Sequence, residues 1–274
     1  MANIDGFITD YIKNKNDLIN SKMKRIKIFV RNLDDANFSA NVNPFFGYRA
    51  KRNDVKGYGE SFYEETYIVN RKRQENKYFI EFGSSGDDNC FGNTSYLRKK
   101  GFDGLLIDAN TNPYGCDEIK RKYNVIFKML TVENIIGVFK ENNVPKQFDF
   151  LSIDIDSNDY WVWKALNYEA NLVLIEYNPN FSTDQSVALK YDPNRVWGKN
   201  VAFSASFSAM VKLGEEKGYI PVDHLGHDIL FLKKSFLKDD EIKNININPD
   251  LPKKIHNQNG YDQFIEVKTL SNFA

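Results

Sequence analysis

Short apolar runs alternate with longer segments of helical periodicity from residue 78 to residue 232. Runs of this kind are typical of buried strands, whereas apolar residues three or four positions apart are typical of helices. The predicted strands are Tyr78–Phe82, Leu105–Asp108, Val125–Lys128, Phe150–Ile153 and Leu172–Ile175. The predicted helices are Asn93–Lys100, Pro113–Lys122, Val132–Asn142, Asp159–Leu166 and a last one near Ser204–Lys217. This alternation indicates a parallel sheet with helices on both faces.

Two further strands are predicted close together near the end of this pattern, at Tyr219–Val222 and Ile229–Leu232. Because so short a connection leaves no room for a crossover helix, the two strands must form an antiparallel hairpin. The predicted fold class is therefore α/β, with a doubly wound, mostly parallel seven-stranded sheet that ends in an antiparallel hairpin.

Composition and charge narrow the possible partners. The chain has 274 residues, of which 42% are hydrophobic and 14% aromatic, as expected for a packed globular protein. Its 37 basic and 37 acidic residues cancel, so the net charge gives no reason to expect a nucleic acid or an anionic membrane as partner. A slight basic excess in residues 1–77 is explained by solvated helix faces, or by a basic surface that favours a phosphorylated or acidic acceptor.

The cysteines and the first residues indicate a cellular compartment. Cys90 and Cys116 form no Cys-x-x-Cys pair, which argues against a zinc site or a disulfide framework and favours a reducing cytoplasm. The first twenty residues contain several acids and no continuous apolar core, so they do not resemble a signal peptide. No apolar run reaches the length of a membrane span. We therefore expect a soluble cytoplasmic protein.

A glycine-containing turn follows the first predicted strand. Glu81 lies near the end of that strand, Gly83 and Gly86 permit a tight turn, and Asp108 ends the second strand. Since the carboxyl ends of parallel strands form the ligand-binding edge of such sheets, Asp108 is placed to accept both hydroxyls of a ribose. The turn lacks the Gly-x-Gly-x-x-Gly spacing of dinucleotide sites, which argues against a nicotinamide or flavin cofactor. A tight turn without a ligand remains the alternative.

Carboxylates are concentrated after the fourth and fifth predicted strands. Asp154, Asp156 and Asp159 follow the fourth strand, and Glu176 and Asn178 follow the fifth. The two-residue period of a strand places Asp154 and Asp156 on one side, while Asp159 fits the cap of the next helix. Grouped carboxylates repel one another unless a cation or a proton lies among them. A Mg²⁺ site formed by Asp154, Asp156, Glu176 and Asn178 is therefore a minority interpretation.

Two other positions have more than one interpretation. Leu130 and Thr131 follow the third strand, where Thr131 fits a helix cap with Asn134 and also a contact to a ligand ring, and the two roles are compatible. His224 and His227 flank the predicted hairpin turn, and His227 is a candidate general base because its imidazole titrates near neutral pH. A solvated turn histidine is the simpler alternative.

Three segments resemble the class I S-adenosylmethionine-dependent methyltransferases, in particular the FkbM-like group that modifies sugars and other small molecules. They are Glu81–Gly86 with Ile107–Asp108, then Leu151–Trp163, and Leu174–Pro179. The resemblance implies a Rossmann-like sheet, S-adenosylmethionine as cofactor, Mg²⁺ as an option, and a sugar or sugar-phosphate acceptor used in surface glycan biosynthesis. A non-catalytic scaffold with the same fold and an N-methyltransferase remain alternatives.

The resemblance also assigns roles to residues and segments. The residues expected to bind the cofactor are Glu81, Gly83, Ser84, Gly86, Asn93, Thr94, Asp108, Ala109, Leu130, Thr131 and Asp154. Those expected to act on the acceptor are Asp156, Glu176 and His227. Residues 78–235 would form the cofactor-binding core and residues 236–274 a C-terminal extension. The resemblance does not cover residues 1–77; there the loop-like, aromatic and mildly basic stretch 32–67 predicts a helical and loop segment that covers the acceptor.

Overall fold

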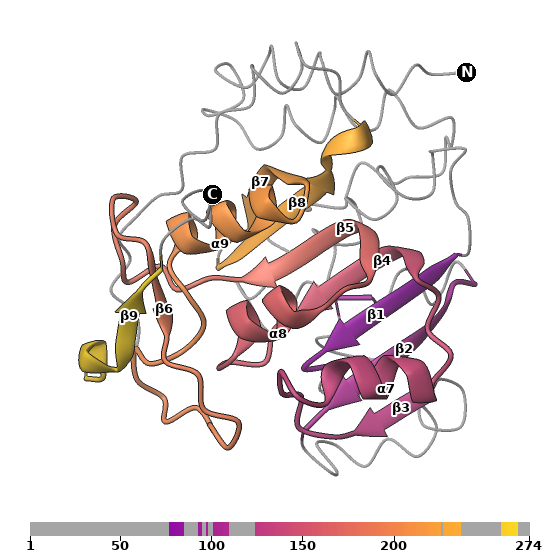
Figure 1. The fold of residues 1–274 in the computed structure, drawn as a ribbon, viewed down its shortest axis with the longest axis horizontal. Coiled ribbons are helices and arrows are strands. Elements are labelled where there is room, and N and C mark those ends of the chain that lie inside the picture. Colours follow the sequence, from indigo (N-terminus) through magenta and orange to yellow (C-terminus); the bar gives the residue numbers. More distant parts are fainter. Residues whose placement is uncertain are drawn as a thin grey trace, which may run out of the picture.

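A seven-stranded mixed sheet forms the centre of the molecule, in the strand order β3-β2-β1-β4-β5-β8-β7 (Figure 1). The computed structural model describes residues 77–84, 93–94, 97, 101–109, 124–225, 227–236 and 259–267. The first five strands of the sheet run parallel, whereas β8 runs antiparallel to both β5 and β7. The predicted fold class, a doubly wound α/β sheet that ends in an antiparallel hairpin, is confirmed. Residues 1–76 of the predicted amino-terminal segment 1–77, the helix at 113–122 and Gly86 lie outside the described residues.

The strands begin and end close to the predicted positions, but the central ones are longer. Their bounds are β1 Tyr78–Phe82, β2 Asp103–Asp108, β3 Asn124–Phe127, β4 Gln147–Ile153, β5 Glu169–Glu176, β7 Tyr219–Leu225 and β8 Asp228–Lys233. The hairpin strands extend inward until only residues 226–227 separate them, so His224 belongs to β7 and does not flank a long turn.

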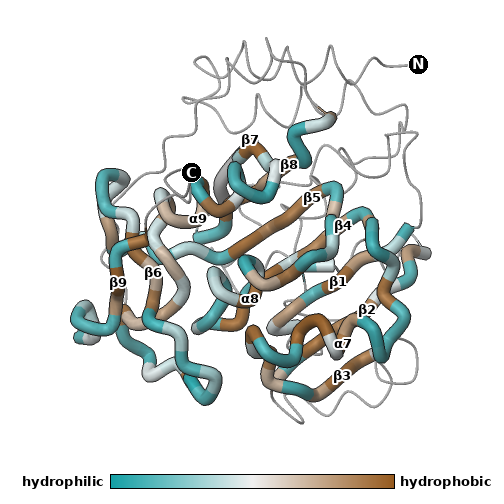
Figure 2. The backbone as a smooth tube through the Cα atoms, viewed as in Figure 1, coloured by the Kyte–Doolittle hydropathy of each residue, from teal (hydrophilic) through white to brown (hydrophobic). Residues whose placement is uncertain are grey.

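The middle of the sheet is almost entirely buried. In β4 every residue from Phe148 to Ile153 is buried, and β5 is buried from Leu172 to Glu176. A parallel sheet covered on both faces favours such continuous apolar runs over strict alternation. Figure 2 shows this hydrophobic character along β5. The same feature explains why apolar runs predicted these strands correctly.

Three helices contribute to one buried cluster with the strands, namely α7 Ile135–Glu141, α8 Asp159–Ala165 and α9 Phe207–Glu216. Neighbouring helices contact each other, α7 with α8 and α8 with α9. From α8, the buried Trp163 packs against Tyr219 of β7 and Phe231 of β8. The helices therefore fix the hairpin against the parallel strands.

The first turn of α7 depends on two side chains that precede it. The main-chain N–H of Thr131 donates to Asn134 Oδ1 at 2.9 Å, and the N–H of Asn134 donates to Thr131 Oγ1 at 3.3 Å. This reciprocal arrangement is that of a capping box and agrees with the predicted pairing of Thr131 with Asn134, but the N-cap position of the regular helix is Asn134 and not Thr131. Residues 132–134 form a turn and the regular helix begins at Ile135 instead of Val132.

A second sheet, which the sequence pattern did not predict, pairs β6 Val187–Leu189 with β9 Phe264–Glu266. The two antiparallel strands lie beside the main sheet in Figure 1, beyond the end of β5. We call residues 177–206, between β5 and α9, the insert. The C-terminal strand β9 thus pairs with the insert, and Lys190 and Arg195 add polar contacts to residues 262 and 263.

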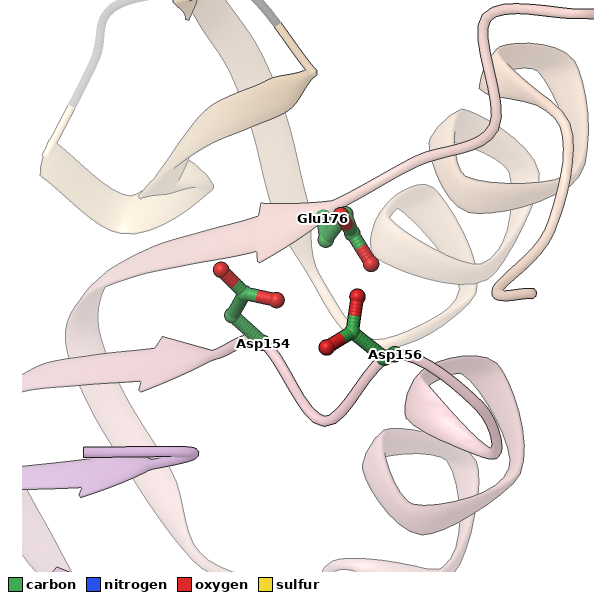
Figure 3. Close-up of side chains that lie close together, drawn as sticks. All are labelled: Asp154, Asp156 and Glu176. Atoms are coloured by element: carbon green, nitrogen blue, oxygen red, sulfur yellow. The ribbon is translucent and has the colours of Figure 1, made fainter. Parts of the chain in front are cut away.

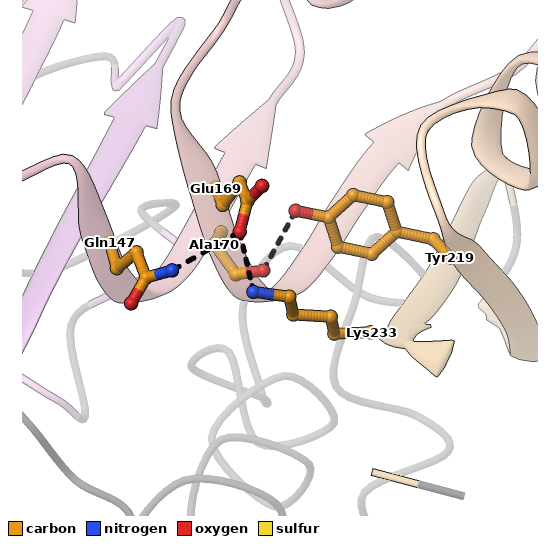
Figure 4. Close-up of polar contacts among 5 residues, drawn as sticks. All are labelled: Gln147, Glu169, Ala170, Tyr219 and Lys233. Carbon is orange, nitrogen blue, oxygen red and sulfur yellow. Dashed lines mark hydrogen bonds and ion pairs between the residues drawn. The ribbon is translucent and has the colours of Figure 1, made fainter. Parts of the chain in front are cut away.

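Polar contacts hold the amino end of β5 against the hairpin (Figure 4). The buried phenol of Tyr219 donates to the carbonyl oxygen of Ala170 at 2.8 Å. Nearby, Lys233 Nζ lies 2.5 Å from Glu169 Oε2, which also accepts from Gln147. These contacts lie at the sheet edge opposite to the carboxyl ends of the parallel strands, so they belong to the scaffold.

Among the described helices, none combines the length and the apolar character that a membrane span requires.

Candidate active site

Three carboxylates converge at the carboxyl ends of β4 and β5. Asp154 follows β4, Asp156 lies in the loop before α8, and Glu176 ends β5 (Figure 3). One carboxylate oxygen from each side chain lies within 4.8 Å of the other two. Asp154 and Asp156 are half-buried, whereas Glu176 is 2% exposed. This placement agrees with the prediction that these acids share one sheet edge.

The reason why Asp154 and Asp156 lie together differs from the prediction. Strand β4 ends at Ile153, and Asp156 adopts a left-handed conformation with φ of +56°. The chain therefore turns back at Asp156 instead of continuing as an extended strand with a two-residue period. The left-handed conformation costs a non-glycine residue about 1–2 kcal/mol, so surrounding contacts must hold Asp156 in it.

Asp159 supplies those contacts. Its carboxylate accepts from the main-chain N–H of Ile155 at 2.8 Å and from that of Ser157 at 3.0 Å, on either side of Asp156. Asp159 is the first residue of α8, and the N-cap position belongs to Asn158. The predicted role as a helix cap is therefore wrong, because the side chain binds the preceding loop.

Burial and neighbouring charge strongly affect the ionisation of Asp159. The side chain is fully buried, and loss of solvation raises its pKa to about 7. The hydrogen bond from Ile155 opposes this change, whereas the nearby charges of Asp154 and Asp156 raise the pKa further. The pKa of the buried Asp159 thus depends on the charge of the neighbouring carboxylates Asp154 and Asp156.

A fourth carboxylate at this edge was missed by the sequence interpretation. Asp228, the first residue of β8, lies directly opposite Glu176 in the antiparallel pair. Side chains at opposed positions lie on the same face, about 4.5–5.5 Å apart at Cβ. Both residues are buried, with 1% and 2% exposure. The sequence does show an acid beside the hairpin turn. That this acid pairs with Glu176 follows only from the register of the two strands.

His227 reaches the same edge through its main chain. Its carbonyl oxygen accepts from the N–H of Tyr177 at 2.6 Å, directly after β5. The imidazole is half-buried. The hairpin therefore places His227 next to the residue that follows Glu176.

Asn178 does not join the carboxylates. Its side-chain nitrogen donates to the carbonyl oxygens of Val201 and Phe203, at 2.7 and 2.9 Å. Its side-chain oxygen accepts from both nitrogens of Asn180. Since these contacts use both ends of a fully buried amide, Asn178 anchors the insert and drops out of the metal-ligand set.

The turn after β1 is more tightly packed than the sequence indicated. The N–H groups of Gly83 and Ser84 both donate to the carbonyl oxygen of Ile107, at 2.9 and 3.4 Å. These two amides therefore close the turn onto β2 and do not point at a ligand. The hydroxyl of Ser84 is buried and, among the described residues, has no hydrogen-bond partner. A bound polar group would satisfy it.

Glu81 also binds protein atoms. Its carboxylate accepts from the main-chain N–H groups of Asn93 and Thr94, and from the hydroxyl of Thr94. Asn93 donates in turn to Ser152 Oγ at 2.8 Å, on β4. The three predicted cofactor-side residues Glu81, Asn93 and Thr94 are thus brought together, and Glu81 holds residues 93–94 against the ends of β1 and β4.

Asp108 and the residues after β3 complete this edge. Asp108 ends β2 with a half-buried side chain, and Ala109 after it is exposed. The Asp108 carbonyl oxygen accepts from the N–H of Lys128, two residues before Leu130. The structure therefore places Asp108, Ala109, Leu130 and Thr131 at the ends of β2 and β3, on the side of β1 opposite to Asp154.

No protein-family model matches the chain, and the search of curated proteins finds no match. Among solved structures, the N-terminal domain of EvdMO1 with SAH bound is 10% identical, with 77% of this chain and 92% of that chain covered at a TM-score of 0.41. The same domain in the presence of SAH and D-fucose is 12% identical, with 77% and 94% covered at 0.42. The CMeT domain of the citrinin polyketide synthase is 10% identical, with 65% and 51% covered at 0.38. With identities and TM-scores this low, the function of the chain has to be inferred from its own residues.

Proposed function

We propose that this chain is a class I S-adenosylmethionine-dependent methyltransferase that acts on a hydroxyl group of a small acceptor. The observation that carries the proposal is the order of polar groups along one sheet edge. Asp108 ends β2, the turn with Ser84 follows β1, and the group of Asp154, Asp156 and Glu176 follows β4 and β5. Because β2, β1 and β4 are adjacent, one S-adenosylmethionine molecule could lie across the end of β1, with its nucleoside at β2 and its methyl group at β4.

The cofactor half of the site would lie over β1 and β2. Asp108 would accept the ribose hydroxyls, and Leu130 and Thr131 would lie beside the adenine ring. The buried Ser84 hydroxyl suits the carboxylate of the methionine part, since it has no partner among the described residues. Asp154 suits the amino group better than Glu81, because the Glu81 carboxylate already accepts hydrogen bonds from residues 93–94.

The acceptor half would lie over β4 and β5. S-adenosylmethionine supplies an electrophilic methyl group on a sulfonium. Asp156 and Glu176 would orient the acceptor hydroxyl, and one carboxylate would take its proton as the oxygen bonds to the methyl carbon and the carbon–sulfur bond breaks. His227 is the alternative base, because its main chain adjoins Tyr177 at the end of β5.

A sugar or sugar-phosphate acceptor for surface glycans is the specific form of this proposal, and it rests on the FkbM-like sequence segments. Neutral sugar hydroxyls are compatible with the carboxylate group because carboxylates accept their hydrogen bonds. The phosphate of a sugar-phosphate would have to lie away from the carboxylate group, since negative charges in contact repel each other.

A metal-assisted version is favoured by one observation, the approach of three carboxylate oxygens within 4.8 Å. Oxygen ligands of this kind suit Mg²⁺. Asp154, Asp156 and Glu176 would hold the ion without Asn178, whose amide anchors the insert.

Calorimetry and transfer assays test the proposal together. S-adenosylhomocysteine should bind and NADH should not, and the opposite result would overturn the assignment. Radiolabelled S-adenosylmethionine should then label at least one hydroxyl acceptor among D-fucose, sugar phosphates and other small alcohols. Labelling only of amines would favour the N-methyltransferase, and binding without any transfer would favour the non-catalytic scaffold.

A further inference from the structure

We infer that Ser204 and Asp159 are positioning residues that together hold the Asp156 and Glu176 carboxylates face to face. This inference rests on the proposed function and extends it to two residues that would not touch cofactor or acceptor. Both side chains are fully buried, at 0% exposure.

Ser204 connects the two segments that carry the facing carboxylates. Its hydroxyl donates to the carbonyl oxygen of Glu176 at 2.7 Å, and its main-chain N–H donates to the carbonyl oxygen of Ser157 at 3.1 Å. Ser157 follows Asp156 directly. A single residue of the insert therefore joins the end of β5 to the loop before α8.

Asp159 fixes the other side of that loop. Its two carboxylate oxygens bind the N–H groups of Ile155 and Ser157, which flank Asp156. The Ser157 hydroxyl adds a bond to the carbonyl oxygen of Ile155 at 3.0 Å. These bonds hold the residues on both sides of Asp156, whose carboxylate points toward Glu176 (Figure 3).

Backbone strain supports this role. Asp156 and Ser204 both adopt left-handed conformations, with φ of +56° and +50°. Non-glycine residues keep such conformations only where the surroundings fix them, and such positions are concentrated at functional sites. The two strained residues lie at the two ends of the same short connection, through Ser157.

Further contacts tie the insert to this loop. Asn158 Nδ2 donates to the carbonyl oxygen of Asp192 at 2.8 Å, and Trp161 Nε1 donates to that of Leu189 at 2.6 Å. Leu189 belongs to β6, which pairs with the C-terminal strand β9. Ser204 therefore belongs to a segment that several hydrogen bonds fix beside the carboxylates. A change in its position would move the backbone on which both Asp156 and Glu176 lie.

A matched pair of serine variants separates positioning from general stability. Ser206 is as buried as Ser204 and lies two residues away, and its hydroxyl caps α9 and bonds residues 185 and 187. Ser204→Ala and Ser206→Ala should both lower the melting temperature. Only Ser204→Ala should lower kcat, by about 10-fold or more, while S-adenosylhomocysteine affinity stays within about twofold.

The Asp159→Asn variant provides the second arm. It keeps the shape of the side chain and one acceptor oxygen, but it presents an amide to the N–H of Ser157 or Ile155. Asp159→Asn should reduce kcat in the same way as Ser204→Ala without weakening the binding of S-adenosylhomocysteine. Equal kcat for wild type and Ser204→Ala, or equal losses for Ser204→Ala and Ser206→Ala, would overturn the inference.

Crystal structures of the same variants make the test independent of methyl transfer. The inference predicts that the Asp156 and Glu176 carboxylates move apart in Ser204→Ala and stay in place in Ser206→Ala. Unchanged carboxylate positions in Ser204→Ala would contradict the inference even if no acceptor were found. Absence of transfer in the wild-type protein would instead count against the proposed function.

Discussion

Gly83 lies directly against the main-chain carbonyl of Asp154, so that a Cβ at this glycine would come 1.7 Å from the Asp154 oxygen. The glycine has a φ of +73°, and the N–H of Asp154 donates to the carbonyl oxygen of Phe82 at 3.3 Å. The glycine thus allows β1 and β4 to end side by side. It sets the distance between the proposed cofactor half and the acid-bearing loop.

Gly83→Ala should disrupt this edge. The added methyl group cannot fit without moving the backbone, so we expect unfolding free energy to fall by about 3 kcal/mol or more. Gly101→Ala is the matched control, because Gly101 has a similar φ of +79° but no described atom within 4 Å of the position that a Cβ would take. It should lose only about 1–2 kcal/mol. Urea unfolding of both variants measures the difference, and equal losses would show that positive φ alone explains Gly83.

Asp108→Ala should weaken S-adenosylhomocysteine binding if Asp108 accepts the ribose hydroxyls. Each hydrogen bond to a charged group contributes about 1.5–3 kcal/mol, so calorimetry should show an affinity loss of at least about tenfold. Asp103→Ala is the control, since Asp103 lies at the amino end of the same strand, away from the proposed site. Unchanged affinity in Asp108→Ala would remove the residue from the cofactor site.

Asp156→Asn should preserve cofactor binding and reduce transfer. The amide keeps the shape of the side chain but removes a base or a metal ligand, so turnover should fall by roughly 10²–10⁴. Asp184→Asn, at an exposed position of the insert, is the control and should behave as wild type.

Chelation distinguishes the two versions of this mechanism. Loss of wild-type activity in EDTA, restored by Mg²⁺, would support a metal on the carboxylate group. Activity that does not change in EDTA would support a side-chain base. Normal turnover of Asp156→Asn would exclude Asp156 under either version.

Asp159 should make stability fall as pH rises. Its pKa is about 7 in the folded protein, against an ordinary value of 3.8. Between these values the folded protein keeps a proton that the unfolded chain has released, so this contribution to stability is full below pH 4 and is lost through pH 7. The unfolding free energy of wild type relative to Asp159→Asn should decline across this range, by at most about 1.4 kcal/mol per pH unit. A constant difference would refute the raised pKa.

Tyr219→Phe should destabilise the scaffold without affecting catalysis. Removal of the hydroxyl group leaves the buried Ala170 carbonyl without this donor, which costs about 1–3 kcal/mol. Lys233→Met, which breaks a partly exposed ion pair, should cost less than about 1 kcal/mol. Thermal unfolding compares the two, and a larger effect of Lys233→Met would contradict this ranking.

The sequence by itself determined the sheet and the edge where the polar groups collect. Apolar runs such as Leu172–Ile175 are long enough and buried enough to define strands, because a sheet covered on both faces requires them. Parallel strands then place Asp108, Asp154 and Glu176 at the same edge, since alternation with helices leaves no other arrangement. Those predictions depend on local patterns, which a single sequence displays.

Only the tertiary structure decided which side chains are available at that edge. Glu81 and Asn178 fit ligand roles by position, but long-range hydrogen bonds to residues 93–94 and to Val201 and Phe203 give them structural roles. The pairing of Glu176 with Asp228 likewise depends on strand register. The short strands β6 and β9 are separated by more than seventy residues, and with 3 residues each they are too short to show a pattern of their own. Contacts between distant segments determine these features, and no local periodicity encodes them.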